Sequence, residues 1–117
     1  MESEEQKLEE IISMLKSRHL KVRSRLTVLK NGKKAVCITW SEENGENMNF
    51  DGVQIFRSVK RYSGYGKKPI YVSKSDRYYN TSIKKGMKYY YKVRGFIEFN
   101  GKKYYTDYST KAIRTVK

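Results

Sequence analysis

Residues 84–96 read KKGMKYYYKVRGF, a lysine-glycine turn that runs into three consecutive tyrosines and then into an alternating segment. Successive side chains of a β-strand point to opposite faces of a sheet. As a strand, the segment has two faces, with Tyr89, Tyr91 and Val93 on one and Tyr90, Lys92 and Arg94 on the other. The question for the fold is whether the tyrosines form a stacking surface for a ligand or hold a sheet together.

Strand signals fill the chain from Leu20 onward. In KAVCITW, residues 34–40, alternation places Val36, Ile38 and Trp40 on one face and turns Cys37 and Thr39 to the other, outward face. In the same way, Val53 and Ile55 share a face of the run at 53–58. Further strand-like runs lie at 20–29, 70–72, 87–99, 102–108 and 112–116.

Turn signals separate these runs. Asn100-Gly101 lies between two alternating segments and is the strongest short hairpin signal in the chain. Asn31-Gly32 predicts another turn, a polar loop covers 41–52, and Pro69 indicates that the strand after it lies at a sheet edge. About seven short strands with turns between them and little helix predict an all-β fold, an antiparallel β-sandwich.

The first 19 residues differ and predict an amphipathic helix. Ser3 and Gln6 fit a capping box. An apolar stripe with helical spacing consists of Leu8, Ile11, Ile12 and Leu15. A helix of this length is marginal alone in water, so the stripe must dock on its own domain, on a sister chain or on another protein. We expect docking to another chain, which divides the sequence into a docking helix at 1–19 and a sandwich at 20–117.

Charge is unevenly distributed along the chain. The formal net charge is +14, yet residues 1–20 carry five glutamates against three basic side chains, a net −2 that leaves +16 for the rest. Such a field attracts nucleic acid, acidic cell-wall polymer or an acidic protein surface. The single cysteine excludes an internal disulfide. The acidic N-terminus is unlike a signal peptide and no apolar run is long enough to span a membrane, so we expect no membrane partner.

Four short motifs follow one another in an order that suggests a known family. These are Trp40, DGVQIFRS at 51–58, IKKGMKYYYKVRGF at 83–96 and NGKKYYTDYS at 100–109. Together they resemble the second-strand tryptophan, the third strand, the tyrosine corner and the last hairpin of a fibronectin type III domain. The likeness is to the lysine- and tyrosine-rich kind found in bacterial and phage surface proteins of the clostridial group. It covers roughly residues 25–117 and leaves out the helix.

The resemblance implies an answer about the tyrosines. Tyr89 would take the corner position, with its ring inside and its hydroxyl bonded to an upstream backbone group. Alternation would then send Tyr91 and Val93 inward with it. The expected structural core consists of Val36, Ile38, Trp40, Val53, Ile55, Tyr89, Tyr91 and Val93.

The outward residues offer two candidate anion-binding surfaces. Tyr90, Lys92 and Arg94, with Tyr104 and Tyr105 on the partner strand, could stack bases and pair phosphates. A solvated sheet face is the alternative, and we favour it because no nucleic-acid motif is present and lysine outnumbers arginine. The loop at 59–69 could cradle an anion between Lys60, Arg61, Lys67 and Lys68. Its spacing is not that of a phosphate loop, so a flexible, solvated loop is favoured.

Nothing in the sequence predicts catalysis, a metal site or a cofactor. His19 is the only histidine and falls at the end of the helix, where it is expected to cap. Cys37 has no histidine nearby in sequence, and Asp51, Asp76 and Asp107 are isolated turn residues. We therefore expect a protein that is not an enzyme.

The leading hypothesis is a non-enzymatic accessory component of a bacteriophage particle, which decorates a capsid or tail surface and docks through the helix or a basic face. It rests on a surface-type module without an export signal, assembled in the host cytoplasm with other protein subunits or with itself. The first alternative is a bacterial cell-surface adhesion module that contacts an anionic polymer. The second is a small basic nucleic-acid-binding protein.

Overall fold

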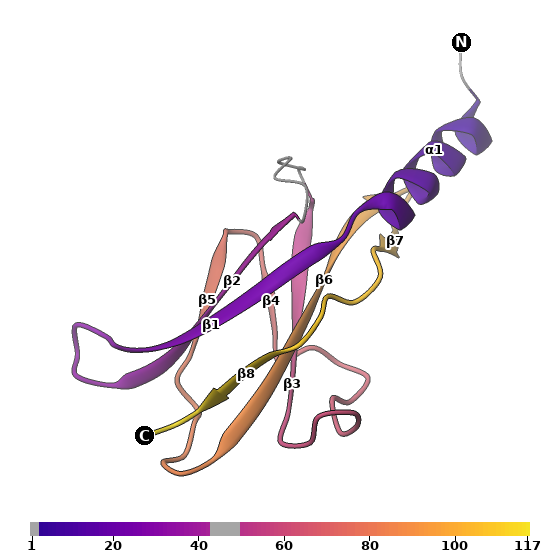
Figure 1. The fold of residues 1–117 in the computed structure, drawn as a ribbon. Coiled ribbons are helices and arrows are strands. Elements are labelled where there is room, and N and C mark those ends of the chain that lie inside the picture. Colours follow the sequence, from indigo (N-terminus) through magenta and orange to yellow (C-terminus); the bar gives the residue numbers. More distant parts are fainter. Residues whose placement is uncertain (1–2, 43–49) are drawn as a thin grey trace.

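A computed structural model of the chain describes residues 3–42 and 50–117, so most of the predicted polar loop at 41–52 lies outside the described residues. Two antiparallel sheets face each other, and one helix lies at the N-terminal end (Figure 1). The three-stranded sheet has the order β1-β2-β5, formed by β1 (Leu20–Val28), β2 (Lys34–Glu42) and β5 (Arg77–Asn80). The five-stranded sheet has the order β4-β3-β6-β7, with β8 also paired to β6, and its strands are β3 (Gly52–Ser58), β4 (Tyr71–Ser73), β6 (Lys88–Phe99), β7 (Lys102–Tyr105) and β8 (Ala112–Thr115). The predicted all-β sandwich preceded by a helix is confirmed.

The turns have the predicted chemistry. Asn100 and Gly101 connect β6 to β7 with φ angles of 52° and 78°, the left-handed pair that a tight hairpin turn requires. Gly32 has a φ of 83° in the turn between β1 and β2. β4 follows Pro69 and lies at an edge of its sheet, as the proline indicated.

The core lies between the two sheets and contains the inward-facing residues of both. Seven of the eight expected core residues are buried, and these are Val36, Ile38, Val53, Ile55, Tyr89, Tyr91 and Val93. Trp40 packs against them but is only half-buried. On one side Trp40 pairs with Val22, whereas the ladder to β5 ends at Thr39. The indole therefore lies beyond the end of β5, where one flank is open.

Buried hydrogen bonds fix the tyrosines of β6. The backbone N–H of Lys84 donates to the hydroxyl of Tyr89 over 2.9 Å, which confirms the tyrosine corner. The hydroxyl of Tyr91 donates to Oδ1 of Asn80 over 2.8 Å, and Arg57 donates to the same oxygen over 3.0 Å. Burial raises the pKa of Tyr91, because the phenolate would lose its hydration inside the core. The bond from Tyr91 connects β6 to β5 and so ties one sheet to the other.

Cys37 lies on the outward face of the three-stranded sheet, as alternation predicted, and its thiol is nevertheless buried. β2 is the central strand of that sheet, and Cys37 is paired with Arg25 on one side and Tyr79 on the other. The two long flanking side chains leave little room for water to reach a small thiol.

The helix α1 (Glu4–Ser17) begins with the predicted capping box. The Gln6 N–H donates to Oγ of Ser3 over 3.2 Å, and the Ser3 N–H donates to Oε1 of Gln6 over 3.1 Å. α1 lies beside β7 and the end of β6, beyond the three-stranded sheet (Figure 1). Leu15 is buried there, whereas Leu8, Ile11 and Ile12 are half-buried. Part of the apolar stripe is therefore covered by the chain itself.

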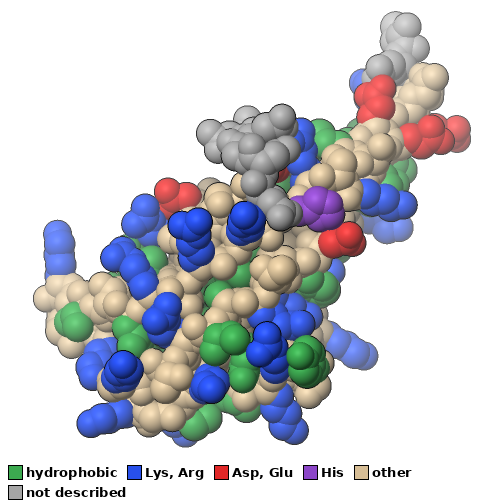
Figure 2. All heavy atoms as spheres, in the orientation of Figure 1, with side chains coloured by type: hydrophobic (Ala, Val, Ile, Leu, Met, Phe, Trp, Pro, Cys, Tyr) green, Lys and Arg blue, Asp and Glu red, His purple; other side chains and the backbone are tan. Residues whose placement is uncertain are grey.

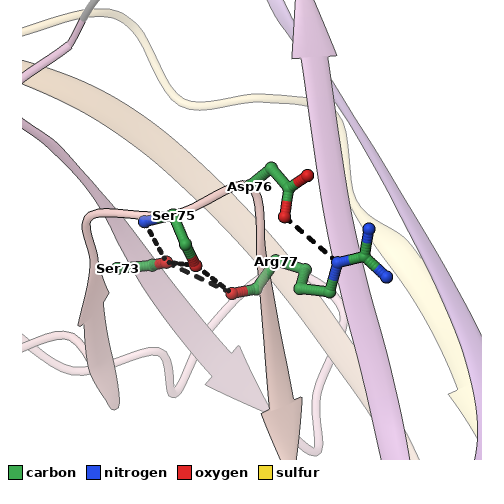
Figure 3. A network of polar contacts seen from close by, with 4 residues as sticks. All are labelled: Ser73, Ser75, Asp76 and Arg77. Atoms are coloured by element: carbon green, nitrogen blue, oxygen red, sulfur yellow. Dashed lines mark hydrogen bonds and ion pairs between the residues drawn. The ribbon is translucent and has the colours of Figure 1, made fainter.

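The crossover from β4 to β5 carries the chain from one sheet to the other (Figure 3). Oγ of Ser73 accepts from the Ser75 N–H over 3.1 Å and donates to the Arg77 carbonyl over 3.2 Å. Oδ1 of Asp76 accepts from Nε of Arg77 over 3.1 Å. The crossover thereby sets Arg77 at the start of β5 with its guanidinium held by a neighbouring carboxylate.

Candidate interaction surface

The residues that could do chemistry are scattered in the structure. In the part of the chain that the structure describes, no group of three His, Cys, Asp or Glu residues could hold a metal ion. Cys37 pairs with Arg25 in the β1–β2 ladder, whereas His19 precedes β1 and is six residues before Arg25, which corresponds to about 20 Å along the strand direction. Arg18, rather than His19, is the C-cap of α1, and its N–H donates to the Leu15 carbonyl over 3.3 Å. Within the described residues, no helix is long and apolar enough to cross a membrane.

Cations and aromatic rings come together on the outer face of the five-stranded sheet. Nζ of Lys92 lies 3.9 Å from the ring centroid of Tyr108 and 4.4 Å from that of Tyr65. Cζ of Arg94 lies 3.7 Å from the Tyr105 centroid and 4.8 Å from the Tyr108 centroid. Such contacts are attractive because a ring face is electron-rich. We call the set Tyr65, Lys92, Tyr108, Arg94 and Tyr105 the cation–aromatic ladder.

A bulged segment after β7 supplies Tyr108. The β6 N–H groups of Gly95 and Val93 donate to the hydroxyls of Thr106 and Ser109, each over 3.0 Å. These side-chain hydroxyls therefore accept hydrogen bonds from β6 N–H groups at positions where no regular strand pairs with β6. The residues between Thr106 and Ser109 bend away from β6, and Tyr108 contacts the buried Phe56 ring edge-on with centroids 5.3 Å apart.

The loop at 59–69 supplies Tyr65, and hydrogen bonds hold its backbone although most of its side chains are exposed, as the sequence predicted. Oγ of Ser58 accepts from the Lys60 N–H over 2.9 Å and donates to the Ser63 carbonyl. Gly64 has a φ of +81°, and a Cβ at this position would lie 2.8 Å from Oγ of Ser58. The Tyr65 hydroxyl donates to the Arg61 carbonyl over 2.7 Å, and its ring is buried. The loop is therefore folded onto the sheet.

Charge on this face is cationic. The first cause that lowers the pKa of Lys92 is burial, and the nearby charges of Lys111 and Arg94 lower it further. Nε of Arg94 donates to Oε1 of Gln54 over 2.9 Å. Among the described residues, neither Lys92 nor Arg94 forms an ion pair with a carboxylate.

The structure brings only part of the predicted surface together. Tyr90 is half-buried and paired with Ile113 of β8, on the same face as Lys92 and Arg94. Tyr105 pairs with Phe96 and shares that face, whereas Tyr104 pairs with Ile97 and points to the other one. The remaining predicted residues are exposed on the loop at 59–69, and they are Lys60, Arg61, Lys67 and Lys68.

Two ladder residues were missed by sequence reasoning. Tyr65 and Tyr108 both lie outside regular strands, so alternation gives no direction for their rings. The only available signal was that each tyrosine has glycine, serine or threonine close to it in the sequence, in YSGYG and TDYS. Those residues turn out to shape the backbone beneath the rings.

The outer face of the three-stranded sheet is a second basic surface, which the sequence analysis also missed. It carries exposed cations on two strands, namely Lys21, Arg23, Arg25 and Arg77. Figure 2 shows lysine and arginine side chains across the visible face of the sandwich, and acidic side chains mainly along the helix. A groove of about 290 Å³ between β1 and the segment at 108–110 includes His19, Arg23 and Tyr108 in its lining.

Comparisons with known proteins identify the fold. No protein-family model matches the chain, and no curated protein matches it. A solved Fn3-like protein from Clostridium thermocellum is 25% identical with a TM-score of 0.55, over 84% of this chain and 88% of that one. The solution structure of a human fibronectin type III domain is 21% identical with a TM-score of 0.63, over 99% of this chain and 84% of that one. The second likeness, at its low identity, concerns the fold alone.

Proposed function

We propose that this fibronectin type III-like domain is a non-enzymatic interaction module that binds an anionic partner through the outer face of its five-stranded sheet. The observation that carries the proposal is the cation–aromatic ladder. Its Lys92 and Arg94 are held against aromatic rings, and no carboxylate among the described residues pairs with them. Cations that are held in place and have no counter-ion among the described residues are available to an anionic partner.

The setting we propose is the surface of a bacteriophage particle, where the chain acts as an accessory component of the capsid or tail. The shape supports a docked component, since the molecule extends 55 Å along its long axis with α1 at one end (Figure 1). Leu8, Ile11 and Ile12 remain half-buried and so keep apolar surface for a second protein. Two elements are thus available for docking, the helix and the basic face.

Purified particles test this setting. Particles from an induced lysate of the source organism are separated on a density gradient and probed with an antibody against the chain. We expect the chain to sediment with the particles and to be released as salt is raised, because exposed charge contacts are screened. Recovery of the chain only in the soluble fraction would remove the proposed setting.

The outer face of the three-stranded sheet favours a second candidate, which is adhesion to an anionic cell-wall polymer. Its cations are exposed and lie on the two strands that flank β2, so they suit diffuse contact with a polyanion. Binding to purified cell walls before and after removal of the anionic polymer distinguishes the two. Adhesion predicts binding that depends on the polymer and is weakened by Arg23→Gln, whereas particle docking predicts retention on particles that carry no such polymer.

A further inference from the structure

We infer that Arg94, with Lys92 beside it, forms a receptor site for two carboxylates of an extended acidic polypeptide segment. The inference rests on the proposed function, because it names the partner class of the same basic face. The proposed ligand is a polypeptide, and binding of nucleic acid or of a second copy of the chain at this face would contradict it.

The Arg94 guanidinium is pre-oriented as a fork. One edge is fixed by the hydrogen bond from Nε to Gln54, and the plane lies against Tyr105 and Tyr108. Nη1 and Nη2 make no hydrogen bond with the described residues, and neither is among the buried side-chain atoms without a partner, so both reach solvent. Two parallel N–H donors of a guanidinium match the two oxygens of a carboxylate. Orientation in advance reduces the entropy lost when a ligand binds.

Lys92 supplies a second positive charge at a useful spacing. It lies two residues before Arg94 on the same strand face, which corresponds to about 7 Å along the strand. In an extended peptide, side chains two residues apart have the same spacing and also point to one face. Two acidic residues separated by one other residue can therefore reach Lys92 and Arg94 together.

Apolar side chains flank the two cations and favour a polypeptide. Val72 lies opposite Gln54 on β4 and is 41% exposed, and Ile113 lies opposite Tyr90 on β8 and is 39% exposed. A peptide that crosses the face can place aliphatic side chains on them. Nucleic acid is less well matched, because base stacking needs open ring faces. The rings of Tyr105 and Tyr108 already carry the Arg94 guanidinium.

Labelled probes test the site on the whole chain. The first probe is a nine-residue capped peptide in which glutamate alternates with valine, the second replaces every glutamate by glutamine, and the third is an oligothymidylate of equal charge. Binding is measured by fluorescence anisotropy at about 150 mM salt. We expect binding of the glutamate peptide and at least a tenfold weaker binding of the other two.

Two matched variants localise the binding. Arg94→Lys keeps the charge and the ring contact but loses the fork, and we expect about tenfold weaker binding of the glutamate peptide, equivalent to about 1.4 kcal/mol. Arg23→Gln removes one exposed charge from the opposite outer face, and we expect less than a twofold change. Trp40 fluorescence and circular dichroism check that each variant is folded. If Arg94→Lys is unstable, the comparison of the glutamate and glutamine peptides on the wild-type chain still tests the site.

Four results would overturn the inference. Equal losses in Arg94→Lys and Arg23→Gln would mean diffuse attraction, and the proposed interaction module would survive without this site. Tighter binding of the oligothymidylate would assign the face to nucleic acid. Self-association of the wild-type chain that Arg94→Lys abolishes would assign it to a second copy. Binding of no probe and no particle would overturn the proposed function itself.

Discussion

The two outer faces of the sandwich both carry cations but hold them in different ways. On the three-stranded sheet, Arg23 and Arg25 are exposed, and each lies opposite a short side chain of β2. On the five-stranded sheet, Lys92 and Arg94 are half-buried and lie against tyrosine rings that arrive from irregular segments. Alternating basic residues therefore produce a diffuse surface on one sheet and a shaped one on the other. The difference comes from the residues that pack over each strand. These residues belong to other segments, so the sequence of the strand itself does not reveal them.

The largest difference in stability between the two outer faces is expected at Phe56. This residue lies on the outer face of the five-stranded sheet and is nevertheless buried beneath the ladder. We expect Phe56→Ala to lower the free energy of unfolding by about 3–5 kcal/mol, as for a core aromatic. Arg25→Ala on the other face should change it by less than about 0.5 kcal/mol. Urea unfolding followed by Trp40 fluorescence measures both. Equal and small effects would mean that the ladder does not enclose Phe56.

The next largest change in the free energy of unfolding is expected at Tyr91, which lies between the two sheets rather than on an outer face. Tyr91→Phe removes the hydroxyl that donates to Asn80 and should lower the free energy of unfolding by about 1–2 kcal/mol at neutral pH. The pKa of Tyr91 is raised by burial, so in the wild type its contribution is complete below about pH 10 and is lost as pH rises above that value. Urea midpoints between pH 8 and 11 should therefore fall less steeply in Tyr91→Phe. Tyr62→Phe, which changes a ring that is 82% exposed, is the control.

Tyr108 tests the ladder itself. Tyr108→Ala removes a ring that contacts both Lys92 and Arg94, and cation–π contacts of this kind contribute about 0.5–1 kcal/mol each. We expect a loss of about 1–2 kcal/mol in the free energy of unfolding and weaker binding of the glutamate peptide. Unchanged stability together with unchanged peptide binding would show that the Tyr108 ring neither stabilises the fold nor orients the two cations.

The smallest expected effect is electrostatic. The charge of Lys111 helps to lower the pKa of Lys92, so Lys111→Gln should raise the Lys92 pKa toward its ordinary value. A pH titration of the Lys92 side chain by nuclear magnetic resonance measures the change. Lys21→Gln, on the other outer face, should leave the Lys92 titration where it was, and an equal response to both variants would contradict local coupling on the ladder face.

Alternation of inward and outward residues predicted much of the fold, but it predicted only part of the candidate site. Alternation in β2 and β6 placed Val36 and Tyr91 in the core, and Asn100-Gly101 placed the last hairpin. Trp40 is less buried than expected because β5 ends one residue short of it, a property of another strand.

The ladder could not be derived in the same way. Tyr65 lies in a loop whose backbone bonds to the hydroxyl of Ser58. Tyr108 lies between Thr106 and Ser109, whose hydroxyls accept from backbone N–H groups of β6. Side-chain direction in such segments depends on tertiary contacts, and no repeat in the sequence encodes them. Local patterns thus indicated which cations face outward but not which of them become oriented.

Backbone amide chemical shifts, recorded as the glutamate–valine peptide is added, report on both outer faces in one sample. If the peptide binds at Arg94 and Lys92, the largest shifts cluster at residues 92–94, 105 and 108, with little change at residues 21–25 and 77. Shifts that are equal on the two faces, or that concentrate on the three-stranded sheet, would contradict this site.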